Sequence, residues 1–231
     1  MTAGWVAAST RSRALLRRTL DAPTGAVLAG ADTWDETRTL LASTAFGTEL
    51  SSTADRSSAR TAATRAMVWQ LRVLAGWLPP ATTGLARVFA APVEIDAIDR
   101  HLRELEAAAP GPDHDGERGP ASIPLGSLGT AWPRASRART LDDVHRVLAR
   151  SAWGDTGGDD RATVLLGLRA AWYRRLVRQA PITTDWAHGA AAVLVARERF
   201  VFERPIPEIP THPLDQLLGR IAGAQHQRVA P

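Results

Sequence analysis

The chain has 231 residues, a formal net charge of +4 at pH 7 and no cysteine. The lack of cysteine excludes disulfides, thiolate metal sites and cysteine nucleophiles. Every basic residue is arginine, whose high pKa raises the isoelectric point to ≈ 10.9 although the 28 basic residues face 24 acidic ones. Such a small excess of positive charge does not favour specific nucleic-acid binding.

The N-terminal arginines follow a weakly apolar start, which is the wrong order for a secretory signal. No apolar run approaches the roughly 20 residues that a membrane-spanning helix needs. We therefore expect a cytoplasmic protein, with an ordinary amphipathic helix within residues 1–20.

Helical signals dominate the first half of the chain. Thr33 is a candidate N-cap followed by acidic residues, and it predicts a helix that ends near Gly47. A second helix is predicted over residues 61–78, ended by Pro79, and a third over residues 94–109, ended by Pro110.

The second half follows a Gly- and Pro-rich stretch at residues 111–124, which has the composition of a linker. Helices are predicted over residues 140–150, 161–179 and 184–200. Prolines then demand an extended segment after Phe202, and a short helix is predicted at residues 214–224. Strand signals are nearly absent, so the sequence predicts an all-α fold.

An internal repeat is the most informative feature of the sequence. Residues 33–47 (TWDETRTLLASTAFG) align without a gap to residues 140–154 (TLDDVHRVLARSAWG). Six of the fifteen positions are identical, including the cap threonine and the final glycine. We expect two pseudo-symmetric helical repeats packed side by side, each burying a face that it cannot bury alone.

These boundaries give four segments. Residues 1–110 form the first helical repeat, residues 111–124 the linker and residues 125–202 the second repeat. Residues 203–231 form a Pro-rich C-terminal tail with a short helix.

Several short motifs in a fixed order resemble the C subunit of V/A-type rotary ATPases, called d in the vacuolar enzyme. The matching stretches are residues 11–16 (RSRALL), 41–46 (LASTAF), 93–100 (VEIDAIDR), 125–128 (LGSL), 148–153 (LARSAW) and the helix at 190–200. Members of that family are all-helical and have three pseudo-symmetric lobes. They act as a non-catalytic socket that couples the central stalk to the membrane rotor ring of proteolipid subunits.

The resemblance implies a coupling or adaptor role in ion transport through protein partners, namely stalk and ring subunits. Membrane association would then be peripheral and through those partners. The chain departs from the family in being shorter and in showing two copies of the unit rather than three. The alternative is an all-helical regulatory or nucleic-acid-associated binding protein without an ATPase role.

No catalytic, cofactor or metal constellation emerges from the residues. The six histidines show no paired ligand spacing, and the Asp113-His114-Asp115 cluster is expected to be a solvated loop. The Gly- and Asp-rich stretch at residues 154–160 lacks the features of a phosphate or calcium loop. There, Asp159 or Asp160 is expected to cap the next helix. We therefore predict that the protein is not an enzyme.

Tryptophan and arginine are the remaining unusual residues. Seven of the eight tryptophans lie on predicted helices or beside them, and we expect core packing with interface anchoring as the alternative. They are Trp34, Trp69, Trp77, Trp132, Trp153, Trp172 and Trp186. The arginine-rich stretches at residues 11–18 and 169–178 are expected to be solvated faces that could also meet an acidic partner.

Overall fold

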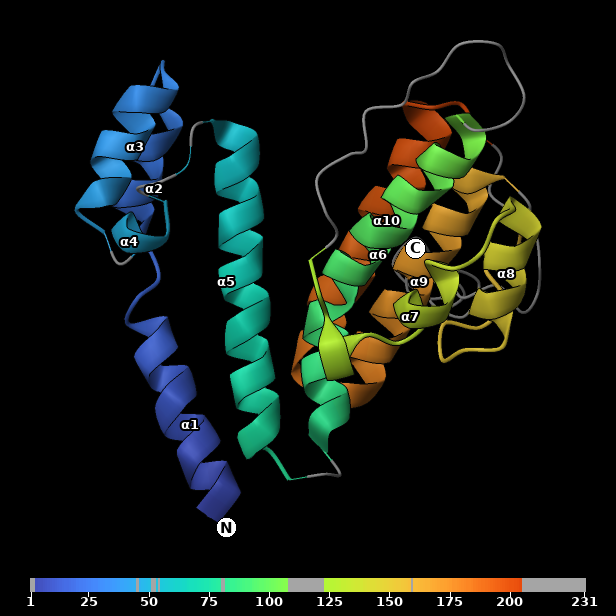
Figure 1. Cartoon of the computed structure of the whole chain (residues 1–231), viewed down its shortest axis with the longest axis horizontal. Helices are drawn as coiled ribbons and strands as arrows, with labels where there is room; N and C mark the ends of the chain where they lie inside the picture. Colours follow the sequence, from blue (N-terminus) through green and yellow to red (C-terminus); the bar gives the residue numbers. More distant parts are fainter. Residues whose placement is uncertain are drawn as a thin grey trace, which may run out of the picture. The chain divides into compact units, whose positions relative to one another are not determined.

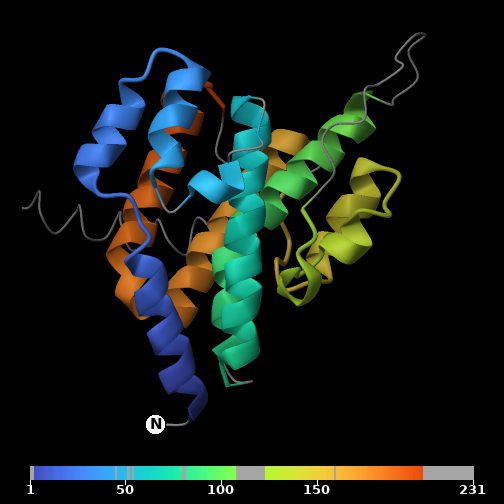
Figure 2. The same cartoon turned by 60° about the vertical axis from the view of Figure 1, so that its left-hand side comes forward.

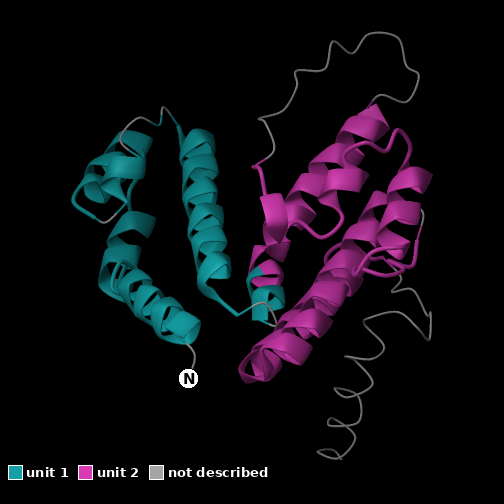
Figure 3. Ribbon diagram, turned by 60° about the horizontal axis from the view of Figure 1, so that its bottom comes forward, with its two compact units in different colours: residues 1–86 teal, residues 87–231 magenta. Residues whose placement is uncertain are grey.

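The computed structural model describes residues 3–44, 46–50, 53, 55–79, 82–107, 123–158 and 160–204. Within these ranges every regular element is a helix and no strand occurs, which confirms the all-α prediction (Figure 1). No helix in the same ranges combines the length and the apolar character needed to cross a membrane. The chain divides into two compact units, residues 1–86 and residues 87–231 (Figure 3).

The first unit is built from the helices α1 (Ala3–Leu16), α2 (Ala22–Ala29), α3 (Trp34–Ala42), α4 (Gly47–Leu50) and α5 (Arg56–Trp77). Helix α1 packs alongside α5, as two views of the chain show (Figures 1 and 2). The described apolar side chains that are fully buried here are few and mostly small: Ala8, Leu50, Ala59, Val68 and Ala86.

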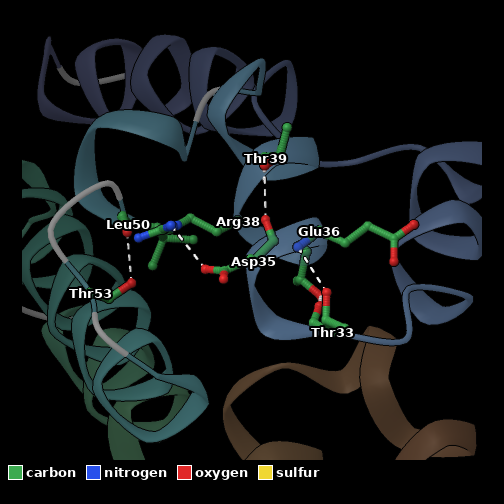
Figure 4. A network of polar contacts seen from close by, with 8 residues as sticks. Thr33, Asp35, Glu36, Arg38, Thr39, Leu50 and Thr53 are labelled. Atoms are coloured by element: carbon green, nitrogen blue, oxygen red, sulfur yellow. Dashed lines mark hydrogen bonds and ion pairs between the residues drawn. The ribbon is translucent and has the colours of Figure 1, made fainter.

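Thr33 caps α3, as predicted. Its hydroxyl oxygen accepts a hydrogen bond from the Glu36 N–H at 3.2 Å (Figure 4). The helix ends at Ala42, however, and the prediction that it extends to near Gly47 is wrong. The Thr44 hydroxyl donates to the Leu41 carbonyl at 2.7 Å and accepts from the Phe46 N–H at 3.2 Å. These bonds satisfy backbone groups at the helix end and turn the chain, so Gly47 begins α4 instead.

The same local geometry occurs in the second copy of the sequence repeat, at helix α8 (Leu141–Ala149), which is as long as α3. The Thr140 hydroxyl accepts from the Asp143 N–H at 3.1 Å. At the other end, the Ser151 hydroxyl donates to the Leu148 carbonyl at 2.7 Å and accepts from the Trp153 N–H at 3.1 Å. The aligned residues of the sequence repeat therefore make the same hydrogen bonds at both ends of the helix.

Two long helices begin earlier than the sequence predicts. Helix α5 begins at Arg56 because Asp55 and Ser58 form a capping box, each side chain accepting from the other's backbone N–H. Helix α6 (Thr83–Ala107) begins at Thr83 and contains Pro92, which removes one backbone donor. The apolar residues around this proline are buried, and tertiary packing of this kind outweighs weak helix propensity.

The second unit contains most of α6, α8 and the helices α9 (Arg161–Gln179) and α10 (Thr184–Phe200), whose predicted bounds are confirmed. Short elements lie between them: η2 (Gly126–Leu128), α7 (Trp132–Ala135) and η3 (Pro181–Thr183). The division between the compact units falls inside α6, so packing places this helix mainly with residues that the sequence assigns to the second repeat.

Helix α9 is the centre of the second unit because it is buried on two faces. One face packs with α6 and α8 through Val164, Leu165, Leu168 and Ala171. The other packs with α10 through Leu166, Ala170, Tyr173 and Leu176, which meet Ala187, Ala191 and Leu194.

Two predicted segments lie largely or wholly outside the described residues. Of the linker at residues 111–124, only residues 123 and 124 are described. Of the Pro-rich tail, the structure describes residues 203 and 204, and the helix predicted at residues 214–224 lies beyond them.

Gly167 lies where α9 passes the backbone of Thr156, and a β-carbon at this position would overlap the Thr156 carbonyl. We predict that Gly167→Ala lowers the free energy of unfolding by about 2 kcal/mol, because the packed backbone must shift. The matched control is Gly76→Ala, a helical glycine with open space around it. That substitution should leave stability unchanged or raise it by up to about 1 kcal/mol in urea unfolding. Equal effects of the two substitutions would contradict the close packing.

Candidate functional site

Glu94 of α6 is a buried carboxylate that is 1% exposed. One of its oxygens accepts hydrogen bonds from three successive backbone N–H groups, of Thr130 at 2.8 Å, Ala131 at 2.5 Å and Trp132 at 2.7 Å. The second oxygen also accepts from Thr130, at 2.9 Å. Because these donors lie at the start of α7, the carboxylate joins α6 to the chain that enters α7.

Arg175 of α9 lies close to this carboxylate and is 6% exposed. Its guanidinium lies over the indole ring of Trp153, 4.8 Å from the ring centroid, and donates to the Thr130 hydroxyl at 3.4 Å. Burial lowers the pKa of Arg175, while the negative charge of Glu94 acts in the opposite direction. These contacts join α6, the start of α7, the segment after α8 and α9 in the interior, where Glu94 and Arg175 are both buried.

A small pocket of about 200 Å³ lies between the start of α9 and the end of α10. It is lined by Asp160, Ala162, Thr163, Leu166, Glu198 and Arg204. The carboxylates in it already have partners within the chain. Asp160 accepts from the Thr163 N–H at 3.1 Å, and the buried Glu198 accepts from Arg197 at 3.3 Å and from Arg204 at 3.5 Å.

The Gly- and Asp-rich stretch before α9 is a capping loop. Asp160 is the N-cap of α9, which confirms that part of the prediction, while Asp159 lies outside the described residues. Gly154 and Gly157 have positive φ angles of 77° and 80°, which turn the loop, and the Asp155 carboxylate accepts from the Gly157 N–H at 2.8 Å.

The structure does not bring the described histidines together. His101 lies 3.1 Å from the Ala138 carbonyl oxygen, His145 lies 3.2 Å from the Asp155 carboxylate and His188 lies on α10. Three others, together with the Asp113-His114-Asp115 cluster, lie outside the described residues: His114, His212 and His226. Among the residues that the structure describes, no group of three His, Asp or Glu side chains is placed to hold a metal ion.

The predicted core packing of tryptophan is correct for one residue and wrong for several others. Trp153 is completely buried, whereas Trp69, Trp77 and Trp186 are exposed. The remaining members of the predicted set are intermediate: Trp34, Trp132 and Trp172. Sequence periodicity alone does not distinguish a buried indole from one that anchors an interface.

The predicted solvated arginine faces are likewise only partly correct. Arg11 donates to Gln70 at 2.6 Å, and its guanidinium lies 5.6 Å from the ring centroid of Trp69 and 5.8 Å from that of Trp77. Arg175 is buried, as described above. These arginines therefore contribute to packing within each unit rather than to a free basic surface.

The main surface that sequence reasoning missed is on α10, and we call it the outer face. It consists of Trp186, Gly189, Val193, Ala196 and Phe200 of α10, together with Ile182 of η3 just before the helix, and all six residues are exposed. The sequence contains the signal for it, because residues 182–200 carry two apolar stripes at helical spacing. One stripe packs on α9 and the other faces outward.

Three comparisons with known proteins, made against family models, curated proteins and solved structures, find no match.

Glu94→Ala should lower the free energy of unfolding by about 3 kcal/mol, because it leaves buried backbone donors without an acceptor and Arg175 without its counter-charge. The control is Glu104→Ala on the same helix, whose carboxylate is exposed and should matter little. Urea unfolding of both variants checks this, and a small loss for Glu94→Ala would contradict the anchoring role.

The cap of α9 gives a pH-dependent prediction. Burial opposes ionisation of Asp160, but hydrogen bonds from Thr163 outweigh it and hold the pKa below its ordinary value of 3.8. The stabilisation is therefore complete above pH 3.8 and is lost as the pH falls through the lowered pKa.

Asp160→Ala should lower the free energy of unfolding by about 1 kcal/mol at neutral pH and by less in acid. Asp32→Ala, which removes an exposed carboxylate that caps no helix, should have little effect at either pH. A cost that stays constant down to pH 2 would contradict the ionised cap.

Proposed function

We propose that the protein is a non-catalytic coupling or adaptor subunit related to the C/d subunit of rotary ATPases, linking a central stalk to a membrane rotor ring. The observation that carries the proposal is the repeated unit, which joins a sequence match to matching hydrogen bonds. Thr33 and Thr140 make equivalent caps, and Thr44 and Ser151 make equivalent turns, at aligned positions of the two copies.

The order of elements extends this similarity beyond the short helices. In each half, the short helix and its turn precede a long helix with an aspartate cap, Asp55 for α5 and Asp160 for α9, and the first half has the additional short helix α4 between them. A proline-containing break and a further long helix follow, α6 in the first half and α10 in the second. We infer that the chain arose by duplication of one helical unit of roughly 100 residues.

The motifs on which the family resemblance rests lie at defined places in these elements. The described residues 41–44 and 148–153 run from the last turns of α3 and α8 into the segments that follow them, residues 93–100 lie within α6, and residues 190–200 lie within α10. Their order matches that of the family, in which the lobes form a socket. Two repeats here would supply a smaller socket than the three lobes of the family.

The proposal of a non-catalytic role is supported by the hydrogen bonds that the described buried and capping carboxylates make within the chain. Glu94 is saturated by backbone donors, and Glu198 and Asp160 are held by partners within the chain. These groups stabilise helix ends and interhelical contacts, which is what an adaptor needs.

The alternative, a nucleic-acid-associated regulator, is less favoured because Arg11 and Arg175 are used in packing. That alternative predicts steeply salt-dependent DNA binding at low micromolar concentration. A mobility shift at about 50 mM salt that disappears at higher salt would favour it over the coupling role.

Affinity purification of the tagged full chain from its native cell tests the coupling role. The expected result is co-purification of identified central-stalk and rotor-ring subunits. The control variant Gly76→Ala, which has open space around the added methyl group, should retain these partners. Recovery of the folded protein without any rotary-ATPase subunit would contradict the proposed function.

A further inference from the structure

The outer face of α10 is an apolar surface with no partner among the described residues of its own unit. Ile182 is 97% exposed, Val193 69% and Phe200 75%. From Trp186 to Phe200 the positions of the face follow one another at intervals of three, four, three and four residues, so they form one continuous stripe along the helix. A contiguous apolar stripe of this kind marks an interaction surface rather than scattered exposure.

The opposite side of the same helix is occupied by its own unit. Ala187, Ala191 and Leu194 pack on α9, and the buried Glu198 continues this side of the helix. Trp186 stands at the edge, with ring contacts at 5.8 Å to Trp172 and 5.9 Å to Tyr173. Helix α10 is therefore held rigidly on α9, and its outer face is preorganised for a partner.

The charges beside the outer face select the direction of that partner. Asp185 lies in the first turn of α10, and Arg199 lies in the last turn. Their positions are separated by two heptads, so both flank the stripe on the same side. A second α10 running parallel would place this flank beside the opposite flank of the other copy, so Asp185 and Arg199 would not meet. A second α10 running antiparallel would place Asp185 beside Arg199 of the other copy and would also oppose the helix dipoles.

We propose that the outer face of α10 binds the same face of a second copy of this chain in an antiparallel pair. The two-fold axis passes between positions 192 and 193, because Asp185 and Arg199 are centred on 192 and Trp186 and Phe200 on 193. Gly189 and Ala196 are small, and they allow the helix backbones to approach closely between the aromatic ends. This inference does not depend on the proposed coupling function.

Sedimentation velocity of the full chain over a concentration series tests the association. We expect a concentration-dependent dimer, and Val193→Glu should weaken it at least tenfold because a carboxylate enters the centre of an apolar interface. The matched control is Val27→Glu, at an exposed valine of α2 that lies off this face and should leave the dimer unchanged. A chain that stays monomeric at about 100 μM overturns the proposal.

Disulfide cross-linking tests whether the two helices run antiparallel. Because the chain has no cysteine of its own, only the introduced cysteines can form a disulfide. Val193→Cys should form a cross-linked dimer on mild oxidation, because the two copies of this position meet at the axis. Phe200→Cys alone should not, since its two copies would lie about 20 Å apart, but it should cross-link to Trp186→Cys when the two variants are mixed. Cross-linking of Phe200→Cys to itself indicates a parallel pair and overturns the proposal. If Val193→Cys does not cross-link and the wild type is monomeric, a second copy of the chain does not cover the outer face. This result also overturns the proposal.

Discussion

The second unit depends on the burial of α9 from two sides. One face of this helix packs with α6 and α8, and the other packs with α10. Helix α9 therefore contributes to both hydrophobic clusters of the unit. Gly167 permits the close approach of the Thr156 backbone on the way into the helix. Because of this two-sided burial, Arg178 and Gln179 at the end of α9 are its only exposed residues.

Two buried polar groups, Glu94 and Arg175, also hold the helices of the second unit together. Glu94 accepts hydrogen bonds from the backbone donors at the start of α7, and Arg175 lies over the Trp153 ring and donates to the Thr130 hydroxyl. A buried charge is costly without such partners, so these contacts fix the relative positions of α6, α7 and α9 within the unit. What remains available for function is the surface, and above all the outer face of α10.

The sequence predicted the helices that carry their own boundary signals. Threonine and aspartate caps located α3, α8 and α9, and Pro181 located the break before α10. It missed the first turns of α6, because Pro92 and a weakly patterned stretch are helical only through tertiary packing. It also missed Glu94 and the exposure of Trp186, since periodicity shows that a stripe is apolar but not which of two stripes meets the core.

Hydrogen exchange resolved along the chain tests the central role of α9 most directly. The account predicts that the amides of residues 164–176 are the slowest to exchange and open only when the second unit unfolds as a whole. The amides of α2, which has no buried residue, should exchange far faster. Exchange in α9 as fast as in α2 would contradict the account.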